Sequence, residues 1–557
     1  MENDSNVNNE EEIVDDYLVE FPEENLAVLE DNDSESDDDV RSNHQQDVNM
    51  IAASGRRWTN LSTEIRRRGR APARNLLRSR PGVIPGVNPS SNKDSFFLFM
   101  DAIIDEAVRF TNLEARRRIS EYNRAHQKQK VWTKIDREEM DAFIGLHVIG
   151  GALKANYRNT LSLWSERDGP PVFRATMSRE RFLIIKRFFR FDDRTRRDAT
   201  DPLSPVRDVW QAFVEKLQQF YVPHENLTID EQLLEFHGRV KFRVYMKSKP
   251  SKYGIKIVWL CDAETSYALN AIPYIGETTL SLAEKNGMST PEAITIAVVK
   301  PFLNKGYHIT ADNWFTSTSL AEKLMAKDTT LVGTVRSNKR ELPPKARSIA
   351  GRQKKSAEFF SSRDQILVSY WDKGTKPVLL LSTLHTEAAI NDVGLPEIIQ
   401  HYNETKSGVD SMDRMVKYYT SKRKCFRWTY GFFCNMIDVA LLNACVIMRP
   451  KAEPSTSDGN MFRFNFLMET GYELVDSQIK KRASVERLSK SVSIAMNLLG
   501  YKRRISNDAT RIHQRSGRCK NCAREKDRKT TQKCSSCDAF VCTMHSLKVI
   551  HCFDCSD

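Results

Sequence analysis

The chain is organised around residues 252–336, where apolar runs of strand length are separated by helical patterns. Residues 253–262 form a β-branched and aromatic run with one early charge, which is typical of a strand buried on both faces. Further strands are expected at 267–275, 307–312 and 329–335, and helices near 293–304 and 317–326. The resulting order, β-β-α-β-α-β, predicts an α/β domain.

Helical periodicity dominates the regions on either side of this block. An apolar stripe begins near residue 96, and the pattern stays helical to about residue 242. Asp136 and Ser178 stand where N-caps of two of these helices are expected. His147 lies on an apolar helix face, so we interpret it as a hydrogen-bonded core histidine rather than a ligand. Later helices are expected at 432–448 and 462–482, and strand-like runs at 365–371 and 376–382.

Two of the predicted strands end in a carboxylate, Asp262 and Asp312. Carboxylates at neighbouring strand ends can converge to hold two Mg²⁺ ions about 3.5–4 Å apart, an arrangement used for phosphodiester cleavage. The best third candidate is Asp410, because a glycine-containing turn precedes a helix that places Asp410 and Asp413 on one face. Any one of these aspartates alone is better explained as a strand-end or cap residue.

Two further clusters flank these acids. Asp230 and Glu231 precede a basic strand, and we interpret them as turn and salt-bridge residues rather than metal ligands. After Asp410, basic residues stand beside aromatic ones, which suits contact with a DNA backbone and stacking on a displaced base. The candidate DNA-binding residues are Lys422, Arg423, Lys424, Arg427 and Trp428. The alternative is that Trp428 belongs to the core and that 422–424 is a solvated turn.

The charge is distributed unevenly along the chain. Residues 1–50 contain 18 Asp or Glu and one Arg, a net charge of −17, so the total of +12 leaves +29 for residues 51–557. A net charge of +29 over residues 51–557 suits binding to DNA or RNA. The alternative is a solvated surface with an excess of lysine and no nucleic-acid partner. The acidic segment is too poor in apolar residues to fold alone. Residues 56–80 contain nine arginines and one glutamate, which suits a nuclear import signal, a DNA-phosphate arm or an unstructured linker.

Cysteine usage predicts a zinc module at the end of the sequence. Seven of the 11 cysteines lie in the last 40 residues, and together with His545 they form four ligand pairs with two-residue spacers. Four such pairs can bind two tetrahedral Zn²⁺ ions. Alternate pairing in a cross-brace gives one site of Cys519, Cys522, Cys542 and His545, and a second of Cys534, Cys537, Cys552 and Cys555. His551 could replace Cys552 in the second site.

No basic-then-apolar leader opens the sequence, and the longest apolar run, near residues 436–448, is interrupted by Asp438 and Asn443. We therefore expect neither a secretory signal nor a membrane span.

Several motifs resemble those of the piggyBac DNA transposases, in the same order from about residue 92 onward. They are Thr228-Ile-Asp-Glu-Gln, Lys249-Pro-Ser-Lys-Tyr-Gly-Ile-Lys, Asp312-Asn-Trp-Phe-Thr-Ser, Gly333-Thr-Val-Arg-Ser-Asn-Lys-Arg-Glu-Leu-Pro and Gly408-Val-Asp-Ser-Met-Asp. The resemblance implies a ribonuclease-H-like core in which Asp262, Asp312 and Asp410 bind catalytic Mg²⁺, with Asp413 beside them. It also implies hairpin-end intermediates, precise excision, TTAA targets, a nuclear location and a homodimer on DNA, with the zinc module reading end DNA.

This interpretation divides the chain into eight segments. They are a disordered acidic and Arg-rich tail (1–91), a helical dimerisation and DNA-binding domain (92–252 and 420–497), a catalytic core (253–337 and 398–419), a β-rich insertion (338–397), a basic linker (498–516) and the zinc module (517–557). The expected function is Mg²⁺-dependent nicking and joining of DNA at transposon ends. One rival is a domesticated DNA-binding protein that no longer cuts, and another is a ubiquitin-ligase or histone-tail-reading finger.

Overall fold

The structure is a computed structural model of the chain. It describes residues 27–28, 50–61, 76–247, 249, 251–372, 374–449, 459–485, 488–501, 516–526, 528–534 and 539–546. The chain divides into two compact units, Met1–Lys480 and Lys481–Asp557, and each is described by itself.

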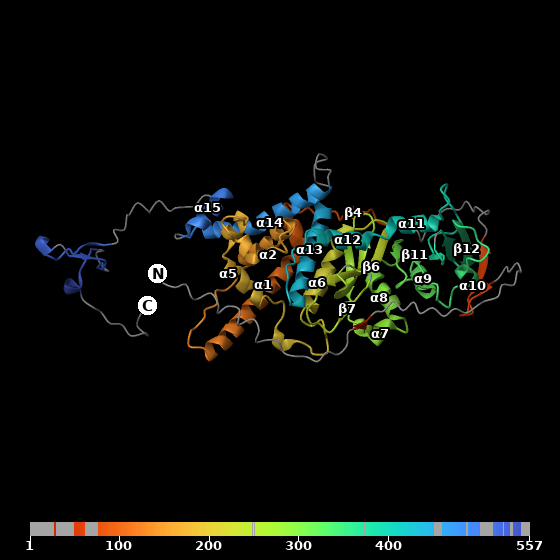
Figure 1. Cartoon of the computed structure of the whole chain (residues 1–557), viewed down its shortest axis with the longest axis horizontal. Coiled ribbons are helices and arrows are strands. Elements are labelled where there is room, and N and C mark those ends of the chain that lie inside the picture. The colour runs from red at the N-terminus through yellow and green to blue at the C-terminus, as the bar shows by residue number, and fades with distance from the viewer. Residues whose placement is uncertain are drawn as a thin grey trace. The chain divides into compact units, whose positions relative to one another are not determined.

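A mixed sheet of 12 strands forms the core of the first unit (Figure 1). Its path is β1-β7-β8-β6-β10-β11-β14-β13-β12-β3-β2, and β9 pairs with β8. The strands are β1 (Ala27–Val28), β2 (Met50–Ile51), β3 (Arg57–Leu61), β6 (Asn226–Glu235), β7 (Arg243–Tyr245), β8 (Tyr253–Asp262), β9 (Ala268–Pro273), β10 (His308–Ala311), β11 (Thr330–Thr334), β12 (Ser356–Ser362), β13 (Gln365–Trp371) and β14 (Val378–Ser382). β6, β10 and β11 run parallel, whereas β8 and β9 are antiparallel to their neighbours. A separate two-stranded pair joins β4 (Gly82–Val83) to β5 (Tyr221–Val222).

The strands predicted at 253–262, 307–312 and 329–335 are confirmed as β8, β10 and β11. β8 is buried along all but its first residue, as its continuous apolar run predicts. The predicted helices are present as α8 (Thr290–Val299) and α9 (Thr318–Met325), on either side of β10 in the chain.

The central strand of this block includes residues that were expected to form a turn. The helical pattern was expected to reach about residue 242, with a basic strand only after Asp230 and Glu231, yet Asn226–Glu235 forms β6, which pairs with β8 on one side and β10 on the other. The charged pair Asp230 and Glu231 interrupts the apolar pattern in the middle of this strand and was interpreted as a turn. Burial on both sides of the pair, at Leu227–Ile229 and at Gln232–Leu234, shows that the strand continues through it.

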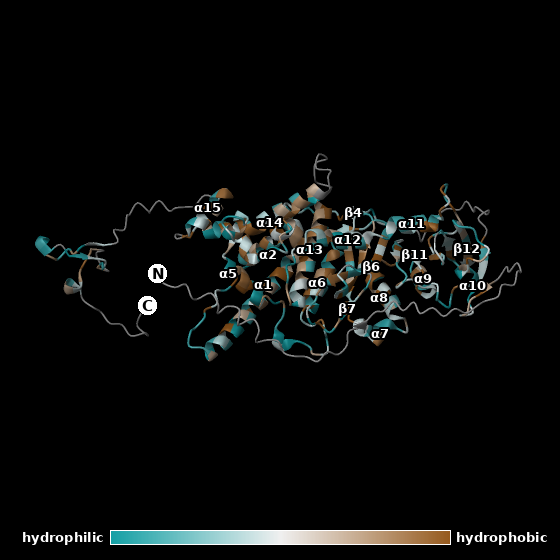
Figure 2. Ribbon diagram, viewed as in Figure 1, coloured by the Kyte–Doolittle hydropathy of each residue, from teal (hydrophilic) through white to brown (hydrophobic). Residues whose placement is uncertain are grey.

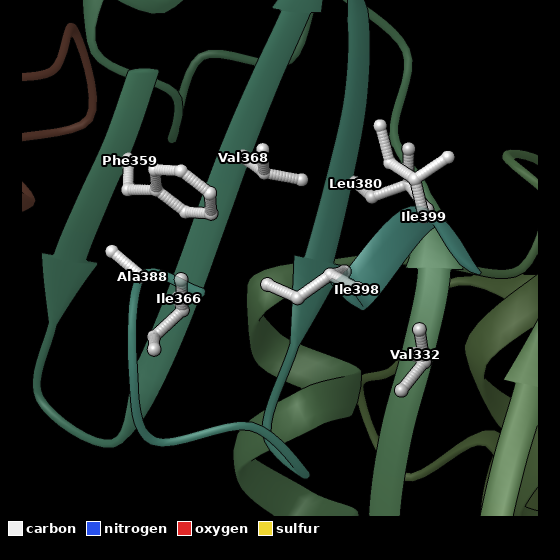
Figure 3. Close-up of a cluster of buried hydrophobic side chains, with 8 residues drawn as sticks. All are labelled: Val332, Phe359, Ile366, Val368, Leu380, Ala388, Ile398 and Ile399. Carbon is white, nitrogen blue, oxygen red and sulfur yellow. The ribbon is translucent and has the colours of Figure 1, made fainter. Parts of the chain in front are cut away.

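The insertion between residues 338 and 397 extends the same sheet. β14 pairs antiparallel with β11, and β13 and β12 follow outward. α11 (Glu397–Thr405) packs on these strands, and Figure 3 shows Ile398 and Ile399 beside side chains from β11 to β14. The buried cluster comprises Val332, Phe359, Ile366, Val368, Leu380, Ala388, Ile398 and Ile399. The expected β-rich insertion thus shares a hydrophobic core with the central sheet.

Part of the amino-terminal tail is ordered, although residues 1–91 were expected to be disordered. β3 pairs antiparallel with β12 and carries Trp58, whose side chain is fully buried. The indole Nε1 of Trp58 donates a hydrogen bond to the carbonyl of Glu341 at 2.8 Å, and Arg56 forms an ion pair with Glu322 at 2.9 Å. The buried indole of Trp58 and the pairing of β3 with β12 therefore attach this segment to the sheet. The remaining acidic and arginine-rich positions lie mostly outside the described residues.

The other helices lie before, between and after these strands in the chain. They are α1 (Asn92–Ala125), α2 (Arg137–Ala152), α3 (Thr160–Leu163), α4 (Pro171–Thr176), α5 (Arg179–Phe188), α6 (Arg207–Leu217), α7 (Leu282–Lys285), α10 (Pro344–Arg347), α12 (Gly408–Tyr418), α13 (Trp428–Met448), α14 (Gly459–Ala483) and, in the second unit, α15 (Lys490–Leu498). The predicted N-caps are confirmed, since Asp136 accepts from the Glu139 amide and Ser178 from the Arg181 amide.

The long apolar helix α13 is a core element. Within the described part of the chain it is the one helix with the length and hydropathy of a membrane span, and 89% of that window is buried in protein. Figure 2 shows hydrophobic residues concentrated along α13 and the central strands. His147 packs against this helix: its Nε2 lies 2.6 Å from the Tyr430 hydroxyl and its Nδ1 lies 2.9 Å from the Phe143 carbonyl. The prediction of a core histidine is confirmed, and burial lowers its pKa to about 3.

Candidate active site

Two carboxylates stand side by side where β10 ends. β10 runs parallel to β6, with Ala311 opposite Ile229. The next residue on each strand is an aspartate, Asp312 after β10 and Asp230 within β6. Because adjacent strands are about 4.8 Å apart, these two aspartates are direct neighbours on the sheet.

The face of β6 that carries Asp230 is covered by α11 and α12. Thr228, Asp230 and Gln232 alternate along the strand and share this face. The Thr228 hydroxyl donates to the Thr405 carbonyl at 2.6 Å, and the Gln232 amide donates to Asp413 at 2.8 Å. Contacts on both sides of Asp230 therefore hold the two helices over it.

Asp410 lies in the first turn of α12, above this face. The helix begins at Gly408, where an added Cβ would come within 2.5 Å of the Thr228 hydroxyl, so glycine permits the close approach. Lys249 lies between the acids, with its Nζ 3.7 Å from Asp410 Oδ1. Burial raises the pKa of Asp230, and the charges of Glu231 and Asp410 raise it further. The structure thus gathers Asp230, Asp312 and Asp410.

The position of Asp312 is fixed by its neighbours. Its Oδ1 accepts hydrogen bonds from the Thr334 hydroxyl at 2.8 Å and from the Asn313 amide at 2.6 Å. Tyr402, from α11, reaches the same place: burial raises its pKa to about 12, together with the charges of Asp312, Asp230 and Asp410. The Tyr402 phenol therefore lies close enough to the three carboxylates for their charges to affect it.

Asp262 does not belong to this group. In the antiparallel β6–β8 ladder it pairs with Leu227, whereas Asp230 pairs with Trp259, so Asp262 lies three residues along the strand, about 10 Å away. The carboxylate is fully buried. Its Oδ2 accepts from the His224 amide and lies 2.9 Å from His224 Nδ1, and its Oδ1 accepts from the amides of Glu264 and Thr265. The Asp262 carboxylate thus accepts hydrogen bonds within a turn, and the structure does not bring this predicted metal ligand together with Asp312 and Asp410.

The sequence did contain a signal for Asp230. Two adjacent acids lie inside a run that is apolar at both ends, Leu227 and Ile229 before them and Leu233 and Leu234 after them. A charge in the middle of a buried strand costs stability, so it is retained where function requires it. The register of the ladder, which separates Asp230 from Asp262, cannot be read from spacing alone.

Most of the predicted DNA-binding residues have partners within the fold. Arg427 donates to the carbonyls of Lys186, Arg187 and Phe189 at the end of α5. Arg423 donates to the carbonyls of Ala155, at 2.6 Å, and Arg158. These guanidinium groups satisfy backbone acceptors at the ends of helical segments.

The rest of that segment follows the same pattern. Lys422 donates to the Glu235 carbonyl, and Trp428 packs edge-on against Phe242 at 5.2 Å between ring centroids. Lys424 is exposed, next to the exposed ring of Phe426. Of the five predicted residues, Lys424 is the most exposed, Lys422, Arg427 and Trp428 are half-buried, and Arg423 is buried.

A basic groove opens beside Asp312. It has a volume of about 480 Å³ and is lined by Asn313, Trp314, Arg336, Lys339 and Arg340 together with three other residues. Arg336 donates to the side chain of Asn313 at 3.1 Å. These basic residues follow β11 and were not selected from the sequence, because no aromatic residue adjoins them in the chain.

The second unit contains one of the two predicted zinc sites. Cys519, Cys522, Cys542 and His545 bring their ligand atoms within 4.8 Å of one another. Their separations include 3.7 Å between the Cys522 and Cys542 sulfurs and 3.4 Å between Cys542 Sγ and His545 Nδ1. Ligands about 2.3 Å from a tetrahedral Zn²⁺ are separated by roughly 3.8 Å, so this group fits zinc. Among the described residues, no other metal-ligating group is as close, and the three aspartates are more widely spaced.

The second predicted zinc site cannot be compared in the same way. Cys534 is described and half-buried, whereas Cys537, His551, Cys552 and Cys555 lie outside the described residues. The small strands β15 (Gly517–Arg518) and β16 (Lys529–Thr530) pair beside the first site.

Comparison with known proteins identifies the family. The family model described as Transposase IS4 matches residues 95–445, well over half of the chain. The chain belongs to this transposase family, and its relatives place it with the piggyBac group.

Both curated relatives and a solved structure are similar to this chain. Human PiggyBac transposable element-derived protein 2 is 25% identical over 364 residues, which cover 62% of this chain and 61% of that protein. Human PiggyBac transposable element-derived protein 3 is 23% identical over 366 residues, covering 62% and 59%. The match therefore spans about three fifths of these relatives. A cryo-EM structure of a piggyBac transposase synaptic complex with hairpin DNA has a TM-score of 0.70 and 32% identity, and covers 86% of this chain and 100% of that one.

Proposed function

We propose that the chain is a DNA transposase whose catalytic residues are Asp230, Asp312 and Asp410. The observation that carries this proposal is the parallel register of β6 and β10, which sets Asp230 beside Asp312 under the first turn of α12. An all-oxygen donor set of this kind suits Mg²⁺. Asp413 has a supporting role, because its oxygens accept from Gln232 at 2.8 Å and from Lys417 at 2.6 Å.

The order of the strands supports a ribonuclease-H-like core. β9, β8, β6, β10 and β11 are successive neighbours, with the first three antiparallel and the last three parallel. In an open sheet with parallel strands, ligand-binding sites form beyond the carboxyl ends of those strands. Asp312 occupies that position on β10, and the helix that carries Asp410 covers it.

Two Mg²⁺ ions bound by these aspartates would activate water or a 3′-hydroxyl group and stabilise the leaving oxygen. The protein contributes orientation: Thr334 fixes the Asp312 carboxylate, and Gln232 fixes the helix that carries Asp410. Successive hydrolysis and transesterification at one site correspond to nicking a transposon end and joining it to a target.

DNA is the proposed partner. The similar synaptic complex contains hairpin DNA, and the groove lined by Arg336, Lys339 and Arg340 lies directly beside Asp312. Basic side chains in this position suit the phosphates of a strand that leads to the site. Family resemblance adds TTAA targets, precise excision, a homodimer, a nuclear location and contacts of the zinc module with end DNA to the proposal.

The test is cleavage of a labelled duplex that carries the element's own terminal repeat, taken from the sequence flanking the gene. The full-length protein with Mg²⁺ should nick the duplex. Asp230→Asn and Asp312→Asn should each reduce nicking at least about 100-fold while DNA binding persists, since each removes an oxygen ligand.

Asp262→Asn discriminates between the two possible triads. Its carboxylate supports a turn, so this variant should lose thermal stability but keep nicking at temperatures where it is folded. Full activity in Asp230→Asn, or loss of metal binding in a folded Asp262→Asn, would overturn the assignment. DNA binding without nicking in the wild type would favour a domesticated, non-cutting protein.

A further inference from the structure

Lys249 is held close to the proposed metal site by a tight turn between β7 and β8. The Met246 amide donates to the Lys252 carbonyl at 2.7 Å, and the Lys252 amide donates to the Lys249 carbonyl at 3.1 Å. Lys252 adopts φ +49°, which closes the turn. Because β8 is antiparallel to β6, this turn lies at the carboxyl end of β6, the same end at which Asp312 follows β10.

The Lys249 ammonium points toward the acids rather than into solvent. It lies 3.7 Å from Asp410 Oδ1 and donates to the Glu231 carbonyl at 3.4 Å. Its side chain is 23% exposed, whereas that of Asp410 is 64% exposed. The carboxylate that Lys249 approaches is thus the most accessible point of contact for an incoming cation.

The other lysines nearby interact with carboxylates outside the proposed triad. Lys256 is fully buried below the Trp314 ring and lies 3.8 Å from Glu231 Oε2. Lys417 lies 2.6 Å from Asp413 Oδ2. Within the described part of the chain, Lys249 is the lysine whose ion pair includes a member of the triad.

From this geometry, and resting on the proposed function, we infer that Lys249 is the resident counter-ion of the catalytic site. Its ammonium and a divalent ion compete for Asp410, so Lys249 sets the metal concentration at which the site fills. In the absence of metal it screens the mutual repulsion of the carboxylates. It is a positioning residue and not itself a metal ligand.

The competition has a measurable consequence. A like charge a few ångströms from a bound cation weakens binding, but the partial exposure of both side chains screens the effect. Replacing Lys249 by methionine should therefore tighten Mn²⁺ binding roughly 3- to 10-fold. Lys249→Arg keeps the charge and should stay near the wild type. Lys252→Met removes an exposed lysine from the same turn and serves as the matched control.

The experiment measures free Mn²⁺ by electron paramagnetic resonance during titration of zinc-loaded, full-length protein without DNA. The expected result is tighter binding in Lys249→Met and a change of less than twofold in Lys252→Met and Lys249→Arg. Unchanged or weaker binding in a folded Lys249→Met would overturn the inference. If Lys249→Met does not fold, Lys249→Gln takes its place with the same expectation.

Asp312→Asn separates this inference from the proposed function. If the wild type and Asp312→Asn bind Mn²⁺ equally, the carboxylates do not form the proposed metal site. If Asp312→Asn weakens binding and Lys249→Met leaves it unchanged, the site stands and the role of Lys249 is refuted.

Discussion

Asp230 and Asp262 differ in what surrounds their carboxylates. Asp262 accepts hydrogen bonds from several amides and lies against His224, so its lone pairs are engaged by the protein. Asp230 accepts one bond from the adjacent Glu231 amide and otherwise faces acids and Lys249. A carboxylate with engaged oxygens stabilises a turn, whereas one with available oxygens can bind a cation. The same residue type therefore has two different roles on neighbouring strands.

A buried histidine, His308, and two half-buried ones, His385 and His401, should make the stability of the first unit sensitive to acid. Burial, together with the charge of His401, lowers the pKa of His308 and of His385 to about 4. Their Nδ1 atoms lie 2.8 Å from the hydroxyls of Thr330 and Ser382, respectively. The unfolded chain has an imidazole pKa near 6.5, so it binds more protons between about pH 6.5 and 4. The free energy of unfolding is therefore highest above about pH 6.5 and decreases as the pH falls from 6.5 to about 4.

The measurement is the melting temperature of the wild type and of His308→Asn between pH 7.5 and 4.5. The wild type should lose stability on acidification by roughly 2 kcal/mol more than the variant, which cannot take up that proton. His237→Asn removes an exposed histidine and should retain the wild-type slope. Parallel pH curves for wild type and His308→Asn would contradict the prediction.

At the scale of elements, the position of α12 along β6 determines where Asp410 lies relative to Asp230. The Gln232 side chain joins them: it donates to Asp413, accepts from the Trp259 indole at 3.0 Å and accepts from Asn435 at 2.9 Å. A buried amide with partners on both of its ends fixes the position of the helix along the strand. Asp410 then lies over Asp230 because the helix has no freedom to slide.

Gln232→Glu tests this relation. It replaces a donor by an acceptor opposite Asp413, so two buried carboxylates would face each other, at a cost of about 2–3 kcal/mol. Asp413→Asn in the same chain supplies a new donor and should recover at least half of that loss. Urea unfolding of both single variants and the double variant gives the coupling energy. Gln211→Glu, at an exposed position of α6, is the control, and additive effects at 232 and 413 would refute the direct contact.

The sequence predicts strands well where burial is continuous and fails where chemistry interrupts it. β8, β10, β11 and β13 were located from their apolar runs. β6 was missed because its two adjacent acids resemble a turn, so Asp230 was not among the predicted metal ligands. Asp312 and Asp410, the other two members of the proposed triad, were predicted because both lie at the ends of recognisable elements. The contacts of Arg423 and Arg427 with distant carbonyls depend on tertiary packing, which no local pattern contains.

At the scale of the whole first unit, one sheet connects the proposed catalytic core to the insertion. β11 pairs with β10 on one side and with β14 on the other. β3, from the amino-terminal region, pairs with β12 farther along the same sheet. The Thr334 hydroxyl that fixes Asp312 belongs to β11. A structural change in the insertion, residues 338–397, can therefore alter the position of the Asp312 carboxylate through β11.

We expect the second unit to depend on metal rather than on a large core. Its described part has short strands and Cys519, Cys522, Cys542 and His545 close enough to share one Zn²⁺. Because so small a module buries little apolar surface, metal binding supplies much of its folding free energy. Removing zinc should therefore unfold this unit while the first unit keeps its melting transition.

Metal analysis of the purified chain tests the cross-brace directly. Four ligand pairs predict two zinc ions per chain. Cys542→Ser should remove one ion and expose the module to limited proteolysis, and Cys534→Ser should remove the other. Equal loss of both ions in each variant would show that the sites fold together, and an unchanged zinc content in Cys542→Ser would refute the first site. The melting temperature of the first unit should stay the same in both variants, because its sheet shares no ligand with the module.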